Sequence, residues 1–361
     1  MSIADTLVAV VAWTLPGLAR QRYREEWLAD LVGARELELS QWSIVGGAVM
    51  AAITIDRTDP SVTGITRANL VANRMRWAAA LIGSAAVLGF GLFLWGGYEM
   101  LEIAPLGLGI QVLAFFLAAL GLFACLGTLV VAFDSASTRT GLALAIGVGV
   151  GVILALMAMV MVMPFLGILA VPASLAAIIV AFSSKRRPAG SQQLSGRSRV
   201  LVSLPFTLLA LLIVVVGVLH ISVWNPLAKA PGLSLDEIYA AMSAAGEAPL
   251  NIFLMVWAIF WGAMAVTLPI LCGIRGVAWF FTARRIIVVG LLLVGTTASF
   301  HWFAGFNMGM SLADTFMTSG GDAAISGPAI AIAGQTALVA ALLIGLPPHR
   351  YTAEMVTAGP R

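Results

Sequence analysis

The stretch Val200–Trp224 reads VLVSLPFTLLALLIVVVGVLHISVW, 25 consecutive residues without an Asp, Glu, Lys or Arg. As an α-helix it would be about 37 Å long, more than the thickness of a bilayer's hydrocarbon core, about 30 Å. It therefore predicts a membrane-spanning helix. Further apolar runs predict seven more spans: Arg76–Tyr98, Ile110–Phe133, Thr140–Val162, Pro164–Phe182, Leu250–Cys272, Ile286–Ala304 and Ile325–Leu346.

The composition of the whole chain agrees with a lipid environment. Of its 361 residues, 60% are hydrophobic and only 10% are charged. Soluble domains are about 45–50% apolar and about 25% charged. The apolar runs are continuous rather than alternating, so helices, not a barrel, must satisfy the backbone in hydrocarbon. We predict an all-α fold: a polytopic transmembrane helix bundle of about eight spans at 75–347, between a head at 1–74 and a tail at 348–361.

The distribution of basic residues predicts the orientation of these spans. With the N-terminus inside, 19 of the 20 Lys and Arg residues fall in inner segments, and Lys229 alone falls outside. Short cytoplasmic loops carry such an excess of Lys and Arg. We therefore expect a multi-pass protein of the bacterial plasma membrane with both termini in the cytoplasm. The net charge of +3 then reflects orientation in the lipid bilayer and not nucleic-acid binding.

The head predicts short helices at the membrane surface. Ser2–Leu15 is an apolar helix with Ser2 and Asp5 spaced as a capping pair, and it is too short to cross the membrane. Trp42–Ile55 is uncharged and has only 14 residues, which favours an interfacial position or packing against the bundle. Asp56–Met75 is predicted to be a linker.

Between these two helices, Tyr23, Trp27 and Leu31 recur every fourth residue and form one apolar stripe on an otherwise charged, amphipathic helix. Such a stripe must be buried, against the membrane surface, the spans or another protein. These three residues are therefore candidates for docking a cytoplasmic or membrane partner subunit.

The head also carries a resemblance. Leu15–Leu31 reads LPGLARQRYREEWLADL, and it resembles the cytoplasmic prefix helix of some bacterial ABC-type permease domains. It is also similar to the head of actinobacterial multi-span membrane proteins, with which the use of 18 Arg against 2 Lys agrees. The resemblance covers this segment alone and suggests a permease role. The chain lacks the large external domain that those permeases carry between spans.

Few polar residues occur within the predicted spans, and none near their centres is Asp, Glu, Lys or Arg. Gln335, Thr296 and Thr297 are the main polar groups at mid-depth. We interpret them as helix-to-helix hydrogen-bonding groups, with contact to a substrate as the alternative.

Small residues recur every fourth position in the third predicted span, which favours close approach of another helix. The approaching helix would belong to the same chain, to a second copy in a homo-oligomer, or to a partner subunit. The residues of this stripe are Ala143, Gly147, Gly151 and Ala155.

His220 and His301 both fall near outer ends of predicted spans, and Met308 and Met310 follow the second of them. These four residues are candidates for a metal or haem site. Interfacial anchoring is the interpretation that we favour, and it predicts no metal ligand and no cofactor.

Hydrolytic and nucleotide-binding motifs are absent from the sequence. The resulting hypothesis is a non-enzymatic membrane protein, a permease-like or accessory subunit of a transport or export system. The alternative is a metal- or haem-handling membrane protein that uses the outer histidines and methionines. An absorbance spectrum and a metal analysis of purified protein would separate the two.

Overall fold

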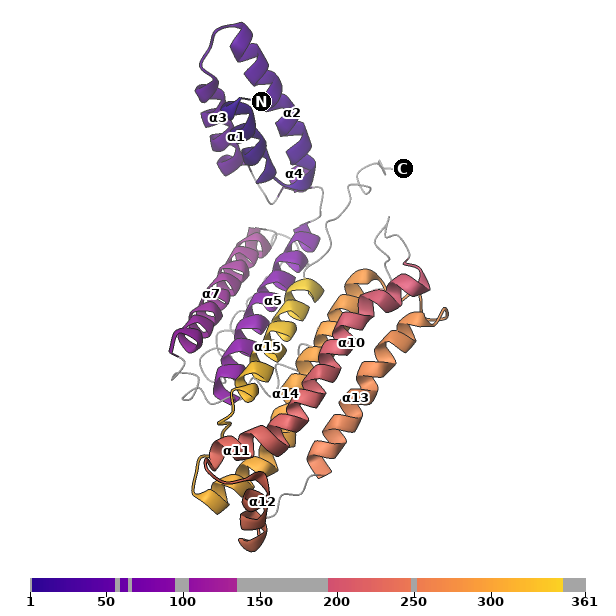
Figure 1. Ribbon diagram of the computed structural model, residues 1–361. Helices are drawn as coiled ribbons and strands as arrows, with labels where there is room; N and C mark the ends of the chain where they lie inside the picture. Colours follow the sequence, from indigo (N-terminus) through magenta and orange to yellow (C-terminus); the bar gives the residue numbers. More distant parts are fainter. Residues whose placement is uncertain are drawn as a thin grey trace. The chain divides into compact units, whose positions relative to one another are not determined.

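The computed structural model describes residues 2–55, 59–63, 67–94, 104–134, 194–247 and 252–346, and all regular secondary structure within these ranges is helical (Figure 1). In these ranges, five helices are long and apolar enough to cross a membrane: Gly107–Thr128, Gly196–Lys229, Ile252–Gly273, Ala283–Phe316 and Ser326–Gly345. The prediction of an all-helical chain with several apolar spans is confirmed at this level. The third and fourth predicted spans lie outside the described residues.

The chain divides into two compact units, one made of residues 1–75, 126–149 and 348–361 and the other of 76–125 and 150–347. In the first unit, helices α1 (Ile3–Trp13), α2 (Gly17–Glu36) and α3 (Gln41–Thr54) pack against one another, and the short helix α4 (Pro60–Thr63) follows. The predicted linker is therefore partly helical, because α4 lies within it and α5 (Arg67–Leu94) begins before its end.

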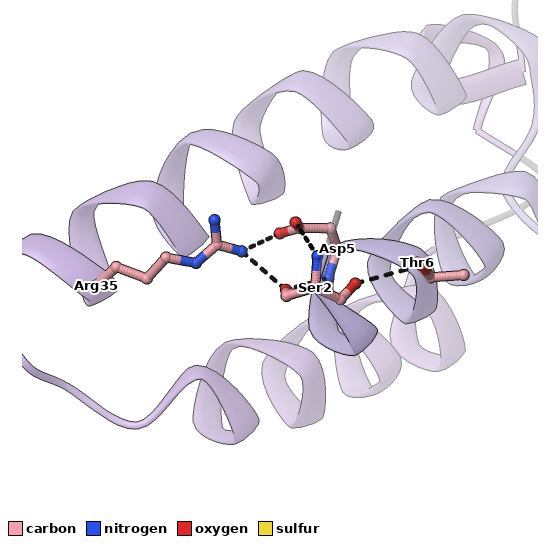
Figure 2. A network of polar contacts seen from close by, with 4 residues as sticks. All are labelled: Ser2, Asp5, Thr6 and Arg35. Atoms are coloured by element: carbon pink, nitrogen blue, oxygen red, sulfur yellow. Dashed lines mark hydrogen bonds and ion pairs between the residues drawn. The ribbon is translucent and has the colours of Figure 1, made fainter.

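Helix α1 begins with the capping pair that its sequence predicts. The Ser2 hydroxyl accepts a hydrogen bond from the Asp5 backbone N–H, and the Asp5 carboxylate accepts one from the Ser2 backbone N–H. Arg35 of α2 reaches the same turn, donating to the Ser2 hydroxyl at 2.9 Å and forming an ion pair with Asp5 (Figure 2). The backbone hydrogen bond at Ser2, helped by Arg35, lowers the pKa of the Asp5 carboxyl. These hydrogen bonds and the ion pair connect the start of α1 to the end of α2.

The apolar stripe of α2 is buried inside the head itself. Trp27 is 7% exposed, and Leu31 is fully buried. They pack with Val8 of α1 and Ala48 of α3, and Tyr23 is partly buried beside them, its ring 5.3 Å from that of Trp27. The burial that the stripe requires is therefore supplied by α1 and α3.

The outer faces of α1 and α3 are apolar and exposed. Ile3, Val10 and Trp13 on α1 and Trp42 and Ile53 on α3 are each between 59% and 73% exposed. The charged residues of the head lie mainly on α2. The head therefore combines an apolar surface with a charged helix.

The second unit contains most of the long helices. The remaining elements are α7 (Ala104–Asp134), α10 (Gly196–Leu219), the π-helical turn η1 (His220–Trp224), α11 (Asn225–Lys229), α12 (Leu235–Ala244), α13 (Ile252–Gly273), α14 (Ala283–Phe316) and α15 (Ser326–Gly345). The bounds of α13 and α15 lie within two residues of the predicted spans. Helix α7 begins six residues before the predicted Ile110, α10 begins four residues before Val200, and α14 continues twelve residues past Ala304. At 34 residues it is about 51 Å long, so it extends beyond a single crossing.

Helix α14 is the most buried of the five candidate spans, and α10 and α15 lie against it (Figure 1). Glycines allow the close approach of α14 and α15. A Cβ at Gly334 would lie 2.4 Å from the Cβ of Ala298, and one at Gly295 would lie 2.5 Å from Cγ of Leu338. A close-packed seam therefore lies between these two helices. The seam predicted at Ala143, Gly147, Gly151 and Ala155 lies outside the described residues.

Candidate functional site

The candidate site is centred on His220 in the π-helical turn that follows α10. A π-turn inserts one extra residue into a helix and often marks a functional position. The turn directs the His220 side chain into the unit, where it is 1% exposed. The adjacent Ile221 belongs to a buried apolar cluster that also contains Trp257. His220 is thus a polar side chain in an apolar environment, where it requires hydrogen-bond partners.

Two residues of the α14–α15 region supply these partners. His220 Nε2 lies 3.1 Å from Oδ1 of Asp322, and His220 Nδ1 lies 2.8 Å from the Ser326 hydroxyl. Asp322 belongs to the loop between α14 and α15, and Ser326 is the first residue of α15. Gly327 leaves space for the carboxylate, because a Cβ there would lie 2.2 Å from Asp322 Oδ2. Both ring nitrogens of His220 are therefore engaged.

Further hydrogen bonds hold the loop in this position. The buried side chain of Asn225 accepts one through Oδ1 from the Ala323 backbone N–H at 2.8 Å. Lys229 donates from Nζ to the Ser319 hydroxyl, also at 2.8 Å. Asn225 and Lys229 are the first and last residues of α11, which follows the π-turn directly. The segment that carries His220 therefore also fixes the loop that carries Asp322.

His301 of α14 completes the cluster. Its side chain is 2% exposed, and its ring centroid lies 5.1 Å from that of His220 and 5.6 Å from that of Trp257. Gly217 makes room for both rings, since a Cβ at that position would lie 2.8 Å from His301 Cδ2 and 2.7 Å from Trp257 Cη2. Two imidazole rings and one carboxylate are thus gathered at one end of the bundle.

Opposing effects determine the ionisation of Asp322. Burial alone would raise the pKa of its carboxyl group. The hydrogen bond from His220 and the positive charge that His220, His301 and Lys229 can carry outweigh burial, so the pKa of Asp322 lies below its ordinary value. Asp322 is therefore a carboxylate at neutral pH and can balance one proton on the histidine pair.

The geometry does not favour the metal site that the sequence leaves open. Met308 is buried in the apolar cluster, whereas Met310 is 42% exposed and follows it by two residues, so the two thioethers do not converge. Within the described ranges, no group of three or more His, Cys, Asp or Glu side chains is placed to hold a metal ion.

The polar residues predicted at mid-span lie in the bundle without joining this cluster. The hydroxyls of Thr296 and Thr297 donate to the carbonyl groups of Leu292 and Leu293 one turn earlier in α14. Gln335 is 6% exposed, and its amide occupies the space beside Gly91 of α5 where a side chain would otherwise lie. Gln335 is thus placed at a contact between helices.

No known family model, curated protein or solved structure matches the chain. The cluster of His220, His301 and Asp322 is therefore the main indication of function. Sequence reasoning identifies His220 and His301 but misses Asp322, Ser326 and Asn225, because these residues come from a loop and from helix ends. The sequence signal that could have indicated them is weak: the acidic Asp322 lies four positions before Ser326, the first residue of α15.

Proposed function

We propose that this chain is an integral protein of the bacterial plasma membrane that crosses the bilayer eight times, with both termini in the cytoplasm. In this proposal it is a non-enzymatic, permease-like or accessory subunit of a transport or export system. The His220, His301 and Asp322 cluster is the site at which a proton or a cationic group of the substrate binds. Ionisable groups inside a membrane bundle commonly mark such pathways.

The partners of His220 are the observation that carries this proposal. With Nε2–H donating to Asp322, a neutral imidazole accepts at Nδ1 from the Ser326 hydroxyl. After protonation the imidazole donates at both nitrogens, and the hydroxyl turns to accept, since it can do either. His220 can therefore gain or lose a proton without losing a partner, and Asp322 offsets the added charge.

The head is assigned an interfacial role on different grounds. Its exposed residues on α1 and α3, including Trp13 and Trp42, are of the kind that stabilise helices lying in the headgroup region. The α2 helix would then present its charges to the cytoplasm, where a partner subunit could bind them.

Charge displacement across a reconstituted membrane tests the role of the cluster. In solid-supported membrane recordings, a pH jump or a jump in a small cation or amine should give a transient current with the wild-type protein. Replacing Asp322 by Asn removes a charge-assisted hydrogen bond worth about 1.5–3 kcal/mol, so apparent affinity should fall about 10- to 100-fold.

The matched control is Asp314→Asn, which removes an exposed carboxylate from the end of α14 and should leave the current unchanged. A current that is equally strong in wild type and Asp322→Asn would contradict the proposed role. Loss of current in both variants would mean that bulk charge, not this cluster, produces the signal.

A further inference from the structure

A second polar site lies at the other end of α10 from His220. A pocket of about 600 Å³ opens there, lined by the start of α10 and by the segment after α13. Its polar lining residues include Ser195, Arg197, Arg199 and Arg275. None of these residues takes part in the histidine cluster, so the pocket needs a separate explanation.

Arg199 lies at the base of this pocket and is buried, with 4% of its surface exposed. Its Nε donates to the Cys272 carbonyl at 2.8 Å, and its Nη1 donates to the Leu194 carbonyl at 2.9 Å. These bonds orient the guanidinium but supply no negative charge. A buried charge without a counter-charge is costly, so an anion at this position would be stabilising.

The chain offers no nearby carboxylate as the counter-charge. The sequence contains no Asp or Glu from 135 to 235 or from 248 to 313, which includes every residue that lines the pocket. The side chains of Arg197 and Arg275 are exposed at its rim. Three guanidinium groups thus surround one pocket with no acid from these segments to balance them.

The backbone adds to this positive character. Ser195 caps α10 by accepting from the Ser198 backbone N–H, which leaves the amides of Gly196 and Arg197 without partners inside the helix. The start of a 24-residue helix also carries partial positive charge. Arginine forks and helix amides are both suited to phosphate oxygens.

The surface beside the pocket is apolar. Leu201 on α10 is 56% exposed, as are Ile270 on α13 at 59% and Ile274 just after it at 45%. A ligand with a phosphate group and a hydrocarbon chain would contact both surfaces at once.

We infer that this pocket binds the phosphate group of a ligand, with an anionic lipid headgroup as its source and acyl chains lying along α10 and α13. Arg199 supplies fixed charge at the base, and Arg197 and Arg275 contact the phosphate from the rim. The inference does not depend on the proposed transport role, because the pocket and the histidine cluster share no residue.

Thermal stabilisation of the full-length protein in neutral detergent tests this inference, with phosphatidylglycerol, phosphatidylcholine and inorganic phosphate added separately. Phosphatidylglycerol should raise the melting temperature, and phosphatidylcholine should not. One arginine near an anionic surface strengthens binding about fivefold. Arg197→Gln or Arg275→Gln should therefore weaken the apparent affinity for phosphatidylglycerol about fivefold, and the double variant should weaken it about 25-fold. Arg76→Gln, which removes an exposed arginine outside the pocket, should change it less than about twofold.

A further informative result is that inorganic phosphate also raises the melting temperature of the wild type and fails to do so in the double variant. That result would support a phosphate site in this pocket and would show that a soluble phosphate can occupy it without a lipid. Arg197 and Arg275 are both exposed, so their variants should fold, which a single symmetric peak in gel filtration would verify. Equal stabilisation of wild type and double variant by phosphatidylglycerol would overturn the inference. So would the absence of any shift with both phosphatidylglycerol and phosphate.

Discussion

Replacing Gly334 by leucine should separate α14 from α15 and lower the stability of the bundle. A Cβ at this position would lie 2.4 Å from the Cβ of Ala298, an atom that can move only with its helix. The opposing Gly295 is also crowded, since its Cβ would lie 2.5 Å from Cγ of Leu338 and 3.1 Å from the Gly334 carbonyl oxygen. Overpacking a core lowers the free energy of unfolding by about 1–3 kcal/mol or more. We expect the cost of a whole leucine side chain at this position to lie at the upper end of that range.

Melting of the detergent-purified protein, followed by the fluorescence of its tryptophans, measures this effect. The matched control is Gly262→Leu in α13, because a Cβ at Gly262 meets nothing within 4 Å. We expect a large drop in melting temperature or loss of soluble protein for the Gly334 variant and little change for the control. Equal melting temperatures for Gly334→Leu and wild type would contradict the close approach of α14 and α15.

Trp27→Glu should open the head. Trp27 is 7% exposed and packs between α1 and α3, so removing its ring alone costs about 3–5 kcal/mol. The new carboxylate would add the cost of a buried charge without a partner. A three-helix unit of this size has little stability to spare.

Limited trypsin digestion of membranes reports the opening, because α2 carries Arg20, Arg22, Arg24 and Arg35. We expect rapid new cleavage at these sites in Trp27→Glu and the wild-type pattern in Ala29→Glu, which places the same charge on the exposed side of α2. Unchanged protection of Trp27→Glu would mean that this stripe does not hold the head together.

The sequence predicts the helical class and most helix positions because hydrocarbon leaves the backbone no alternative. Long apolar runs such as Ile252–Gly273 are therefore readable from composition alone. The capping pair at Ser2 and Asp5 is likewise a local signal, and it is confirmed.

Features that depend on tertiary structure could not be predicted in the same way. Asp322 lies beside His220 in a loop that is held by Asn225, 98 residues before Ala323 in the sequence. The stripe of Trp27 and Leu31 suggests an external partner until α1 and α3 are seen to cover it. Gly334 is one of 37 glycines, and only its neighbour across the helix interface distinguishes it.

In the proposed topology, α10 crosses the membrane with the histidine cluster outside and the arginine pocket inside. Two-sided cysteine labelling tests this most directly, in a background where the buried Cys125 and Cys272 are replaced by alanine. A cysteine at Lys229 should react with an impermeant maleimide in intact cells, and a cysteine at Arg197 should react only after the cells are permeabilised. Reaction of both positions from the same side, or the reverse pattern, would contradict the account.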